Sequence, residues 1–563
     1  MKSAQVLVAE ALALRDASLA AIEPPLVGIP DKIPNNVCSV ADDVLTPDEI
    51  NITSYDVPIL LRLMRDKELS CEAVTRAFLR RAALAQKLTN CITELLPQRA
   101  IERAQYLDSL DEPVGPLHGL PISVKEHHGM AGCTTHCSYV KFIGKPQVGE
   151  VSLNEVLWKA GAVFYARTTQ PQAVMHLETS SNIYGVTTNP HNTNLTSGGS
   201  SGGESALIGF RGSVLIFKGV GGDIGGSIRN PAACTGVYGF KPTTFRIGKT
   251  GGLMAFNGQE GIISTQGPLS TSRSGLNLFM ESYLSYEPWI KDDYLAPIPW
   301  RPVTLPPRLK IAIMWSDGIV IPHPPITRAL KEVARSLADA GIELVDWVPE
   351  GHDECWDITQ ALYFEDGGQT MEQTVLDGGE VLLPLTKWLV KDNENVRYRT
   401  VEEVCAVSLL LYFSPAQEIL IQSNANSILK QLKVRRNMYR LRYNNLWLST
   451  GQTDGHPVDA ILCPAAPGAA PEHGNSKYWS YTSQWNLLDY PGAVFPVSAV
   501  NPKFDLPNKD YVPLNEKDRL NYSLYEPSRY VDAPIGLQLV TRRFEDEKCL
   551  AILEVVEKAM GRE

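Results

Sequence analysis

Two short segments rich in glycine and serine carry residue types that acyl chemistry needs. Residues 197–204 read Ser-Gly-Gly-Ser-Ser-Gly-Gly-Glu, and residues 219–229 read Gly-Val-Gly-Gly-Asp-Ile-Gly-Gly-Ser-Ile-Arg. Apolar runs are interleaved with these glycines, which a flexible linker does not need. Glycine lets backbone N–H groups approach a ligand closely, and serine supplies hydroxyls. The two segments therefore predict a polar, tightly turned reaction centre inside a core.

Ser227 and Lys125 supply a candidate nucleophile and a candidate base. Acyl transfer from an amide needs both, together with hydrogen-bond donors for the oxyanion. The small residues before Ser227 can aim several N–H groups at one point. Lys125 ends an apolar stretch, and burial can lower a lysine pKa by several units. Taken singly, Lys125 would be a surface lysine and Ser227 a helix N-cap, so the hypothesis depends on their occurring together.

Three other ligand-binding or catalytic motifs do not fit. Gly248-Lys249-Thr250 resembles the end of a phosphate-binding loop, but the glycine required five positions earlier falls at Thr243. The run 219–226 does not match the dinucleotide-binding pattern G-x-G-x-x-G. Residues 198–202 satisfy G-x-S-x-G literally. Residues 189–196 before them read as a polar loop, whereas a nucleophile elbow follows a strand.

The chain resembles the amidase signature family, closest to the fungal acetamidase-like general amidases. The segments that carry the resemblance are Gly198–Glu204, Gly222–Ala233 and Gly236–Pro242, with Pro116–Lys125 resembling the lysine strand of the family. Weaker likeness covers Gly161–Tyr165, Pro322–Ile326 and the C-terminal strand, so it spans about residues 45–560. The resemblance implies an amidase that converts a small monocarboxylic acid amide to carboxylate and ammonia. It also implies no metal and no organic cofactor.

The resemblance further implies a role for each site residue. Ser227 would attack the carbonyl and form an acyl-enzyme, Ser200 would relay protons from a cis peptide, and neutral Lys125 would be the ultimate base and then the acid. The backbone N–H groups of residues 224–227 (Ile224, Gly225, Gly226 and Ser227) would hold the oxyanion. Val174 begins a segment, Val174–Thr179, that lines the substrate pocket in relatives.

Asp223 and Arg229 are expected to be structural. They sit at fixed places in the glycine-rich loop, as buried partners that fix it.

The elements that must position these residues read as an α/β protein. Periodicity predicts helices within 54–87, over 152–160, about 416–447 and 545–560, and apolar runs predict strands at 122–124, 162–166 and 535–540. Their alternation predicts a layered sheet. The resemblance makes this a single large domain, with a mixed β-sheet core sandwiched between helices. We expect an N-terminal helix and proline-rich arm over 1–48 and a signature domain over 49–563. Within that domain, the catalytic core is about 116–245 and a variable, helical, substrate-side region is about 270–450.

The chain departs from the family pattern just before the nucleophile loop. Ser200 and Ser227 are 27 positions apart, three more than is usual in the family, and the extra residues fall near Ile216–Lys218. A one-residue shift in a strand turns every side chain to the other face. If the oxyanion donors moved by about 1 Å, activity would fall on the order of a hundredfold. Gly222 also replaces the hydroxyl residue usual before the aspartate.

Three alternatives to a small-amide hydrolase therefore stay open. One is a catalytically impaired protein with the amidase fold, because of the insertion. The others are the amidase subunit of a tRNA amidotransferase and a tailoring amidase that acts on a secondary metabolite.

Composition excludes some partners. The net charge of −11 and a pI of about 5.5 argue against a nucleic-acid surface. No apolar run is long enough to span a membrane, and Glu10, Arg15 and Asp16 interrupt the apolar N-terminus. No C-x-x-C pair or zinc-type Cys/His spacing occurs. We expect a cytoplasmic enzyme with a small-molecule amide as its partner, and a homodimer is a candidate assembly since the family is often dimeric.

Overall fold

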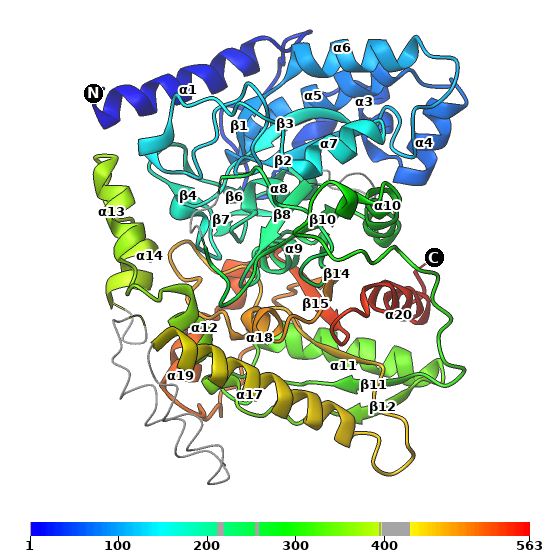
Figure 1. Ribbon diagram of the computed structural model, residues 1–563, viewed down its shortest axis with the longest axis vertical. Coiled ribbons are helices and arrows are strands. Elements are labelled where there is room, and N and C mark those ends of the chain that lie inside the picture. Colours follow the sequence, from blue (N-terminus) through cyan, green and yellow to red (C-terminus); the bar gives the residue numbers. More distant parts are fainter. Residues whose placement is uncertain (1, 211–218, 254–257, 393–395, 397–427, 563) are drawn as a thin grey trace.

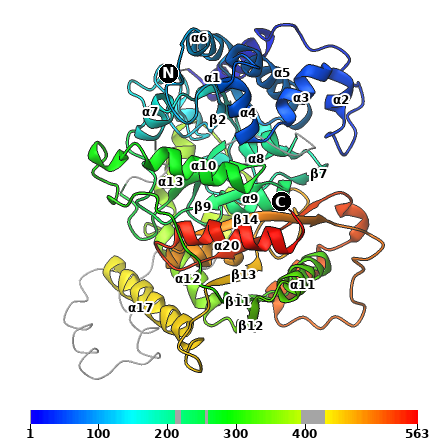
Figure 2. The same ribbon diagram turned by 90° about the vertical axis from the view of Figure 1, so that its right-hand side faces the viewer.

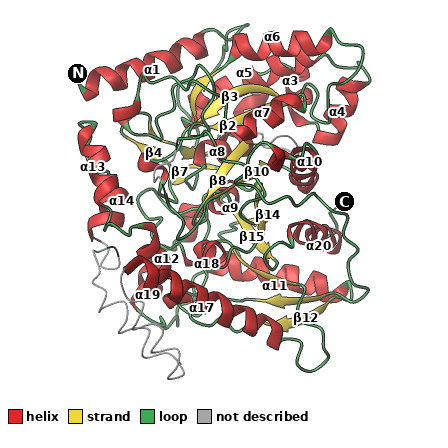
Figure 3. Cartoon of the chain, in the orientation of Figure 1, coloured by secondary structure: helices red, strands yellow, loops and turns green. Residues whose placement is uncertain are grey.

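A large mixed β-sheet forms the centre of the molecule (Figures 1 and 3). The computed structural model describes residues 2–210, 219–253, 258–392, 396 and 428–562. Over these residues the sheet has the order β1-β3-β2-β8-β10-β9-β14-β15-β13-β11-β12. Its strands are β1 (Ile92–Leu95), β2 (Pro121–Lys125), β3 (Val163–Thr168), β8 (Gly219–Asp223), β9 (Tyr238–Lys241), β10 (Thr265–Ser270), β11 (Lys310–Ile313), β12 (Glu343–Asp346), β13 (Ala460–Pro464), β14 (Gly492–Ala499) and β15 (Pro534–Val540).

Parallel pairing is confined to two parts of the sheet. β2 lies parallel to both β3 and β8, and β11 lies parallel to both β12 and β13. The other neighbours are antiparallel. Two small ribbons lie outside this sheet: β4 (Ser180–Ser181) with β5 (Gly185–Val186), and β6 (Thr188–Asn189) with β7 (Asn192–Thr196).

Helices cover both faces of the sheet (Figures 1 and 2). They are α1 (Ala4–Ala20), α2 (Val40–Val44), α3 (Pro47–Ser54), α4 (Val57–Arg65), α5 (Cys71–Thr89), α6 (Pro97–Asp108), α7 (Ser152–Lys159), α8 (Gly202–Gly209), α9 (Arg229–Thr235), α10 (Arg273–Leu284), α11 (Pro324–Asp339), α12 (His352–Tyr363), α13 (Gln369–Asp377), α14 (Pro384–Lys387), α17 (Ile428–Ser449), α18 (Ser480–Leu488), α19 (Glu516–Ser523) and α20 (Asp546–Ala559). Successive side chains of a strand point to opposite faces, so each face has its own core.

The side chains of β13 show these two cores directly. Ala460 and Leu462 belong to a core with α5, α10, α11 and α20, whereas Ile461 and Cys463 belong to a second core with α12, α17 and α18. All four side chains are fully buried. The predicted α/β architecture, with a mixed sheet between helices, is therefore confirmed.

Most predicted elements are present, with two differences. Residues 189–196 are not only a polar loop, since Asn189 ends β6 and Asn192–Thr196 form β7; these strands pair with each other and not with the central sheet. The region 270–450 is largely helical but also contributes β11 and β12 at one edge. Its predicted long helix is observed as α17 from Ile428 on, and the earlier part lies outside the described residues. The insertion at 216–218 also lies outside them.

The N-terminal segment packs onto the central body. α1 begins after Ser3, whose side chain accepts a hydrogen bond from the Val6 N–H, and it lies against β1 (Figure 1). Ile22, Val37 and Val40 are buried in the same core as α5. Among the described helices, none combines the length and apolar character needed to cross a membrane.

Candidate active site

The ends of β2 and β8 bring the predicted base and nucleophile together. These strands are parallel neighbours, with Ser123 opposite Gly219 and Val124 opposite Val220. Their carboxyl ends therefore lie at the same edge of the sheet. β2 ends at Lys125, and β8 leads directly into the loop that carries Ser227. Residues about a hundred positions apart in the chain thus meet at one site.

Lys125 is completely buried, and its amine faces Ser200. Lys125 Nζ lies 2.6 Å from Ser200 Oγ. Burial lowers the pKa of Lys125 from its ordinary value near 10.5 to about 7, although the nearby carboxylates of Asp223 and Glu204 oppose the shift. A substantial fraction of the amine is therefore neutral near pH 7, which is the state that a general base requires.

Ser200 is held at the entry to α8. The peptide bond between Gly199 and Ser200 is cis, as the family resemblance implies. α8 packs close to the sheet because Gly203 has no side chain: a Cβ there would lie 2.5 Å from the backbone nitrogen of Thr169. The Ser201 N–H donates to the carbonyl of Ser227 at 3.1 Å, which ties the two serine loops together.

A buried carboxylate of α8 lies beneath the lysine. Glu204 accepts hydrogen bonds from the hydroxyls of Ser123 and Thr168, each at 2.7 Å. Burial nevertheless raises the pKa of Glu204 to about 7. Its charge favours protonation of Lys125, so Glu204 acts on the pKa of the base without reaching the pocket.

The carbonyl groups of the nucleophile loop all point into hydrogen bonds with neighbouring elements. The carbonyl of Asp223 accepts from Asn486 Nδ2, that of Ile224 from the Tyr363 hydroxyl, and that of Gly225 from the Thr482 hydroxyl. The carbonyl of Gly226 accepts from the Asn230 N–H, and that of Ser227 from the Ser201 N–H. These bonds fix the orientation of the peptide planes. Gly226 adopts a φ of +128°, and a Cβ there would lie 2.6 Å from Thr482 Cβ, so only glycine fits.

Three of the four expected oxyanion donors are free in this arrangement. The N–H groups of Ile224, Gly225 and Ser227 have no protein acceptor within the described part of the chain. The Gly226 N–H differs, because it donates to Asp223 Oδ1 at 2.8 Å. An oxyanion would have to compete with a carboxylate for this donor. Among the described residues, the N–H groups of Ile224, Gly225 and Ser227 thus stay available as candidate oxyanion donors.

Asp223 and Arg229 form the buried structural pair expected from the sequence. Arg229 Nη2 lies 3.0 Å from Asp223 Oδ1 and its Nε lies 3.1 Å from Oδ2, and both side chains are inaccessible to solvent. Burial alone would raise the pKa of Asp223, but Arg229 lowers it to about 2. Asn486 donates to the same carboxylate at 2.8 Å. The pair holds both ends of the loop that carries Ser227.

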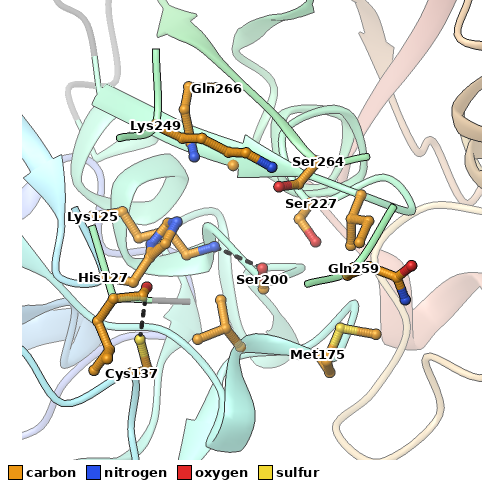
Figure 4. A pocket seen from close by; sticks show the side chains of 14 residues that line it. Lys125, His127, Cys137, Met175, Ser200, Ser227, Lys249, Gln259, Ser264 and Gln266 are labelled. Atoms are coloured by element: carbon orange, nitrogen blue, oxygen red, sulfur yellow. Dashed lines mark hydrogen bonds between the residues drawn. The ribbon is translucent and has the colours of Figure 1, made fainter. Parts of the chain in front are cut away.

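A pocket of about 610 Å³ opens above these residues (Figure 4). Lys125, Ser200, Ser227, Ile224 and Val174 all line it, so the structure brings the three residues of the predicted triad together with the predicted pocket residue. The hydroxyls of Ser200 and Ser227 both face the pocket in Figure 4. The Ser227 hydroxyl makes no hydrogen bond to a described residue, so the contact between the two serines is not formed in this structure.

Several lining residues were missed by the sequence analysis. They are His127, Cys137, Gly222, Lys249, Leu253, Gln259, Ser264 and Gln266, whereas Met175 falls within the predicted segment Val174–Thr179. His127 lies two positions after Lys125, in the turn that follows β2, and burial lowers its pKa well below the ordinary value, so it is neutral. Gln266 is opposite Gly222 in the β10–β8 pairing, which only the sheet order reveals. Lys249 had been weighed only as part of a failed phosphate-loop motif.

Comparisons with known proteins agree with this geometry. The Amidase family model matches residues 73–550. A protein of Schizosaccharomyces pombe whose name places it among amidases is 42% identical over 519 residues, which is 91% of each chain. The acetamidase of Aspergillus oryzae is 35% identical over 552 residues, 96% of this chain and 94% of the relative. A solved structure of fatty acid amide hydrolase superposes with a TM-score of 0.87 at 33% identity, covering 99% of this chain and 95% of that one.

The chain therefore belongs to the amidase family, with the amidase signature fold. It is an amidase-signature hydrolase related to fungal amidases and acetamidases.

Proposed function

We propose that this protein hydrolyses a small monocarboxylic acid amide to the carboxylate and ammonia through a Ser227 acyl-enzyme. The observation that carries the proposal is the buried Lys125 amine at 2.6 Å from Ser200, in a pocket that also contains Ser227. The acetamidase relative supports a small amide as the substrate.

The first half of the reaction forms the ester and releases ammonia. Ser227 Oγ attacks the amide carbonyl as its proton passes to Ser200 Oγ, and the Ser200 proton passes to neutral Lys125. The developing oxyanion accepts hydrogen bonds from the free N–H groups of the loop. The C–N bond then breaks, and the proton returns through Ser200 to the leaving nitrogen. A water molecule repeats the sequence on the ester, releasing the acid and restoring Ser227.

The missing contact between the serines fits this proposal. Ser227 carries its hydroxyl into the pocket with no protein partner among the described residues, and Ser200 is already paired with Lys125. Hydrogen bonds of catalytic residues often tighten only when substrate binds. A substrate whose carbonyl carbon lies beside Ser227 would bring the Ser227 hydroxyl toward Ser200.

Ammonia release from a panel of aliphatic, aryl and indole amides tests the proposal. Wild type should release ammonia and Ser227→Ala should not, while the circular dichroism spectra of the two match. Labelling of Ser227 by a fluorophosphonate would independently show an activated serine. Absence of both turnover and labelling in the wild type would favour the impaired alternative, and deletion of residues 216–218 would then test the insertion.

A tailoring amidase that acts on a secondary metabolite stays a second candidate. The same substrate panel tests it, because such an enzyme would leave small aliphatic amides unchanged and still be labelled at Ser227.

A further inference from the structure

A second cavity, rich in cations, adjoins the pocket of the active site. It opens to solvent and has a volume of about 820 Å³, and its lining includes Lys249 and Gln259, which also line the first pocket. These two side chains therefore stand between the two spaces. In Figure 4 Lys249 extends across the first pocket with its amine toward Ser264.

The charged groups that line this basic cavity do not balance. The cations are Lys249, Arg436, Arg440 and Arg543, and the carboxylates are Glu260 and Asp489. Asp489 is already satisfied, since it accepts from Arg543 Nε at 2.7 Å and from the Thr244 hydroxyl at 2.7 Å. Glu260 is largely exposed and lies 3.8 Å from Lys433 outside the lining. The cavity thus has an excess of positive charge.

The arginines of α17 show that the excess of positive charge is confined to the part of the helix that lines the cavity. On α17, Arg435 pairs with Asp357 at 3.3 Å, and Arg442 pairs with Glu354; both carboxylates belong to α12. Arg436 and Arg440 lie one turn apart and face the cavity without a carboxylate partner among the described residues. Arg436 donates instead to the carbonyl of Gly261 at 2.6 Å. Arg440 donates to the carbonyl of Leu487 at 2.6 Å, so both guanidinium groups are held in place.

The cations also act on one another. Burial, together with the charges of Arg436 and Arg543, lowers the pKa of Arg440 to about 10 against the attraction of Asp489. Lys249 has no ion pair among the described residues; its amine lies 4.7 Å from the ring centroid of Tyr294. Like charges so close together destabilise the empty site, and a bound anion would relieve that repulsion.

We propose that the basic cavity is an anion-binding site, which takes a carboxylate or phosphate group between Lys249 and the arginines of α17. The group can arrive as the charged end of an amide whose carbonyl lies at Ser227, because the two cavities share Lys249 and Gln259. It can also arrive as a separate anion. The first source rests on the proposed function and extends it to amides with an acidic end, whereas anion binding itself does not depend on catalysis.

Calorimetric titration of the full-length protein with glutarate and with inorganic phosphate tests the site. At low salt both anions should bind, and Lys249→Gln and Arg436→Gln should each weaken binding about tenfold or more, as loss of one charged contact implies. Arg442→Gln is the matched control on the same helix, and it should leave binding unchanged. Added salt should weaken binding in the wild type. No binding, or equal binding by the wild type and both cavity variants, would overturn the proposal.

Hydrolysis of glutaramate beside its neutral isostere valeramide distinguishes the two sources. If the anion is the end of the substrate, wild type should prefer glutaramate in kcat/KM, and the preference should fall about tenfold in Lys249→Gln. If the anion is separate, free glutarate or phosphate should change KM for valeramide instead. If neither amide is hydrolysed while phosphate binding still depends on Lys249, the proposed function fails and the anion site stands.

Discussion

Lys125 Nζ lies 2.6 Å from Ser200 Oγ, and the two atoms come from segments that are 75 positions apart in the chain. The contact places a completely buried amine against a buried hydroxyl. Because burial favours the neutral amine, the arrangement suits proton uptake from Ser200.

Replacing Ser200 should interrupt the proton relay without disturbing the fold. We expect Ser200→Ala to lower kcat about 10²- to 10⁴-fold, as loss of a general acid–base group does. Ser201→Ala is the matched control, since the Ser201 hydroxyl is buried without a hydrogen-bond partner among the described residues. Steady-state ammonia release measures both variants. Equal loss in the two would show that the effect is structural.

The activity should rise with pH through the pKa of Lys125. Because the base must be neutral and its pKa is lowered to about 7, kcat/KM should increase about tenfold per pH unit below pH 7 and level off above it. Lys125→Met should lower the rate by about 10²- to 10⁴-fold and abolish this limb. A pH–rate profile from pH 5 to 9 checks the prediction, and a wild-type profile that is flat below pH 7 would contradict it.

The same lysine should make stability depend on pH. Between about pH 7 and pH 10.4 the unfolded chain holds a proton on Lys125 that the folded protein lacks. The free energy of unfolding should therefore rise with pH in this window, by about 1.4 kcal/mol per pH unit from this group alone. Urea unfolding of wild type and Lys125→Met at pH 7 and 9 isolates the contribution. The two proteins should differ in slope, and parallel slopes would refute the lowered pKa.

Breaking the Asp223–Arg229 pair should destabilise the protein and remove activity together. Asp223→Asn leaves the inaccessible Arg229 without its charge partner, which costs about 3–5 kcal/mol in comparable buried pairs. It also weakens the acceptor that holds the Gly226 N–H. Thermal or urea unfolding gives the stability change. The double variant Asp223→Asn/Arg229→Met should lose less than the sum of the single losses, since neither charge is left alone.

Adding a side chain at Gly222 should narrow the substrate pocket. A Cβ at this position would lie 2.9 Å from Gln266 Oε1 and 3.0 Å from His127 Nε2, so both side chains would have to move. We expect Gly222→Thr to fold, because the clashing atoms are the ends of side chains. It should reduce kcat/KM for phenylacetamide more than for acetamide. An unchanged ratio would show that Gly222 does not shape the pocket.

The nucleophile loop illustrates what local sequence can predict. Asp223, Gly226 and Ser227 lie within five positions of one another at the end of β8, and Gly226 adopts a positive φ that favours glycine. The pattern of aspartate, glycine and serine therefore predicts this loop without a structure. Lys125 was also readable, because it ends a buried strand. The strands and most helices followed from periodicity, since an apolar face must be covered.

Other parts of the site depended on contacts that sequence does not encode locally. Thr482 and Tyr363 come from distant helices, and no sequence pattern links them to Ser227. Their hydroxyls nevertheless donate hydrogen bonds to carbonyl groups of the loop that carries Ser227. The Gly226 N–H was expected to be a free donor, but the Asp223 carboxylate occupies it. The short strands β6 and β7 were also missed, because their polar residues lack the alternation typical of a strand.

The sequence by itself determined the family and the class of fold. Ser227, Ser200 and Lys125 stand in long specific motifs, and alternating helices and buried strands indicate a layered sheet. Only the tertiary structure decided which groups face one another. The strand order places β2 beside β8, burial lowers the pKa of Lys125, and the packing of α17 brings to a cavity beside the pocket two arginines that have no carboxylate partner among the described residues. Distances and desolvation arise from contacts between remote segments, which no local pattern contains.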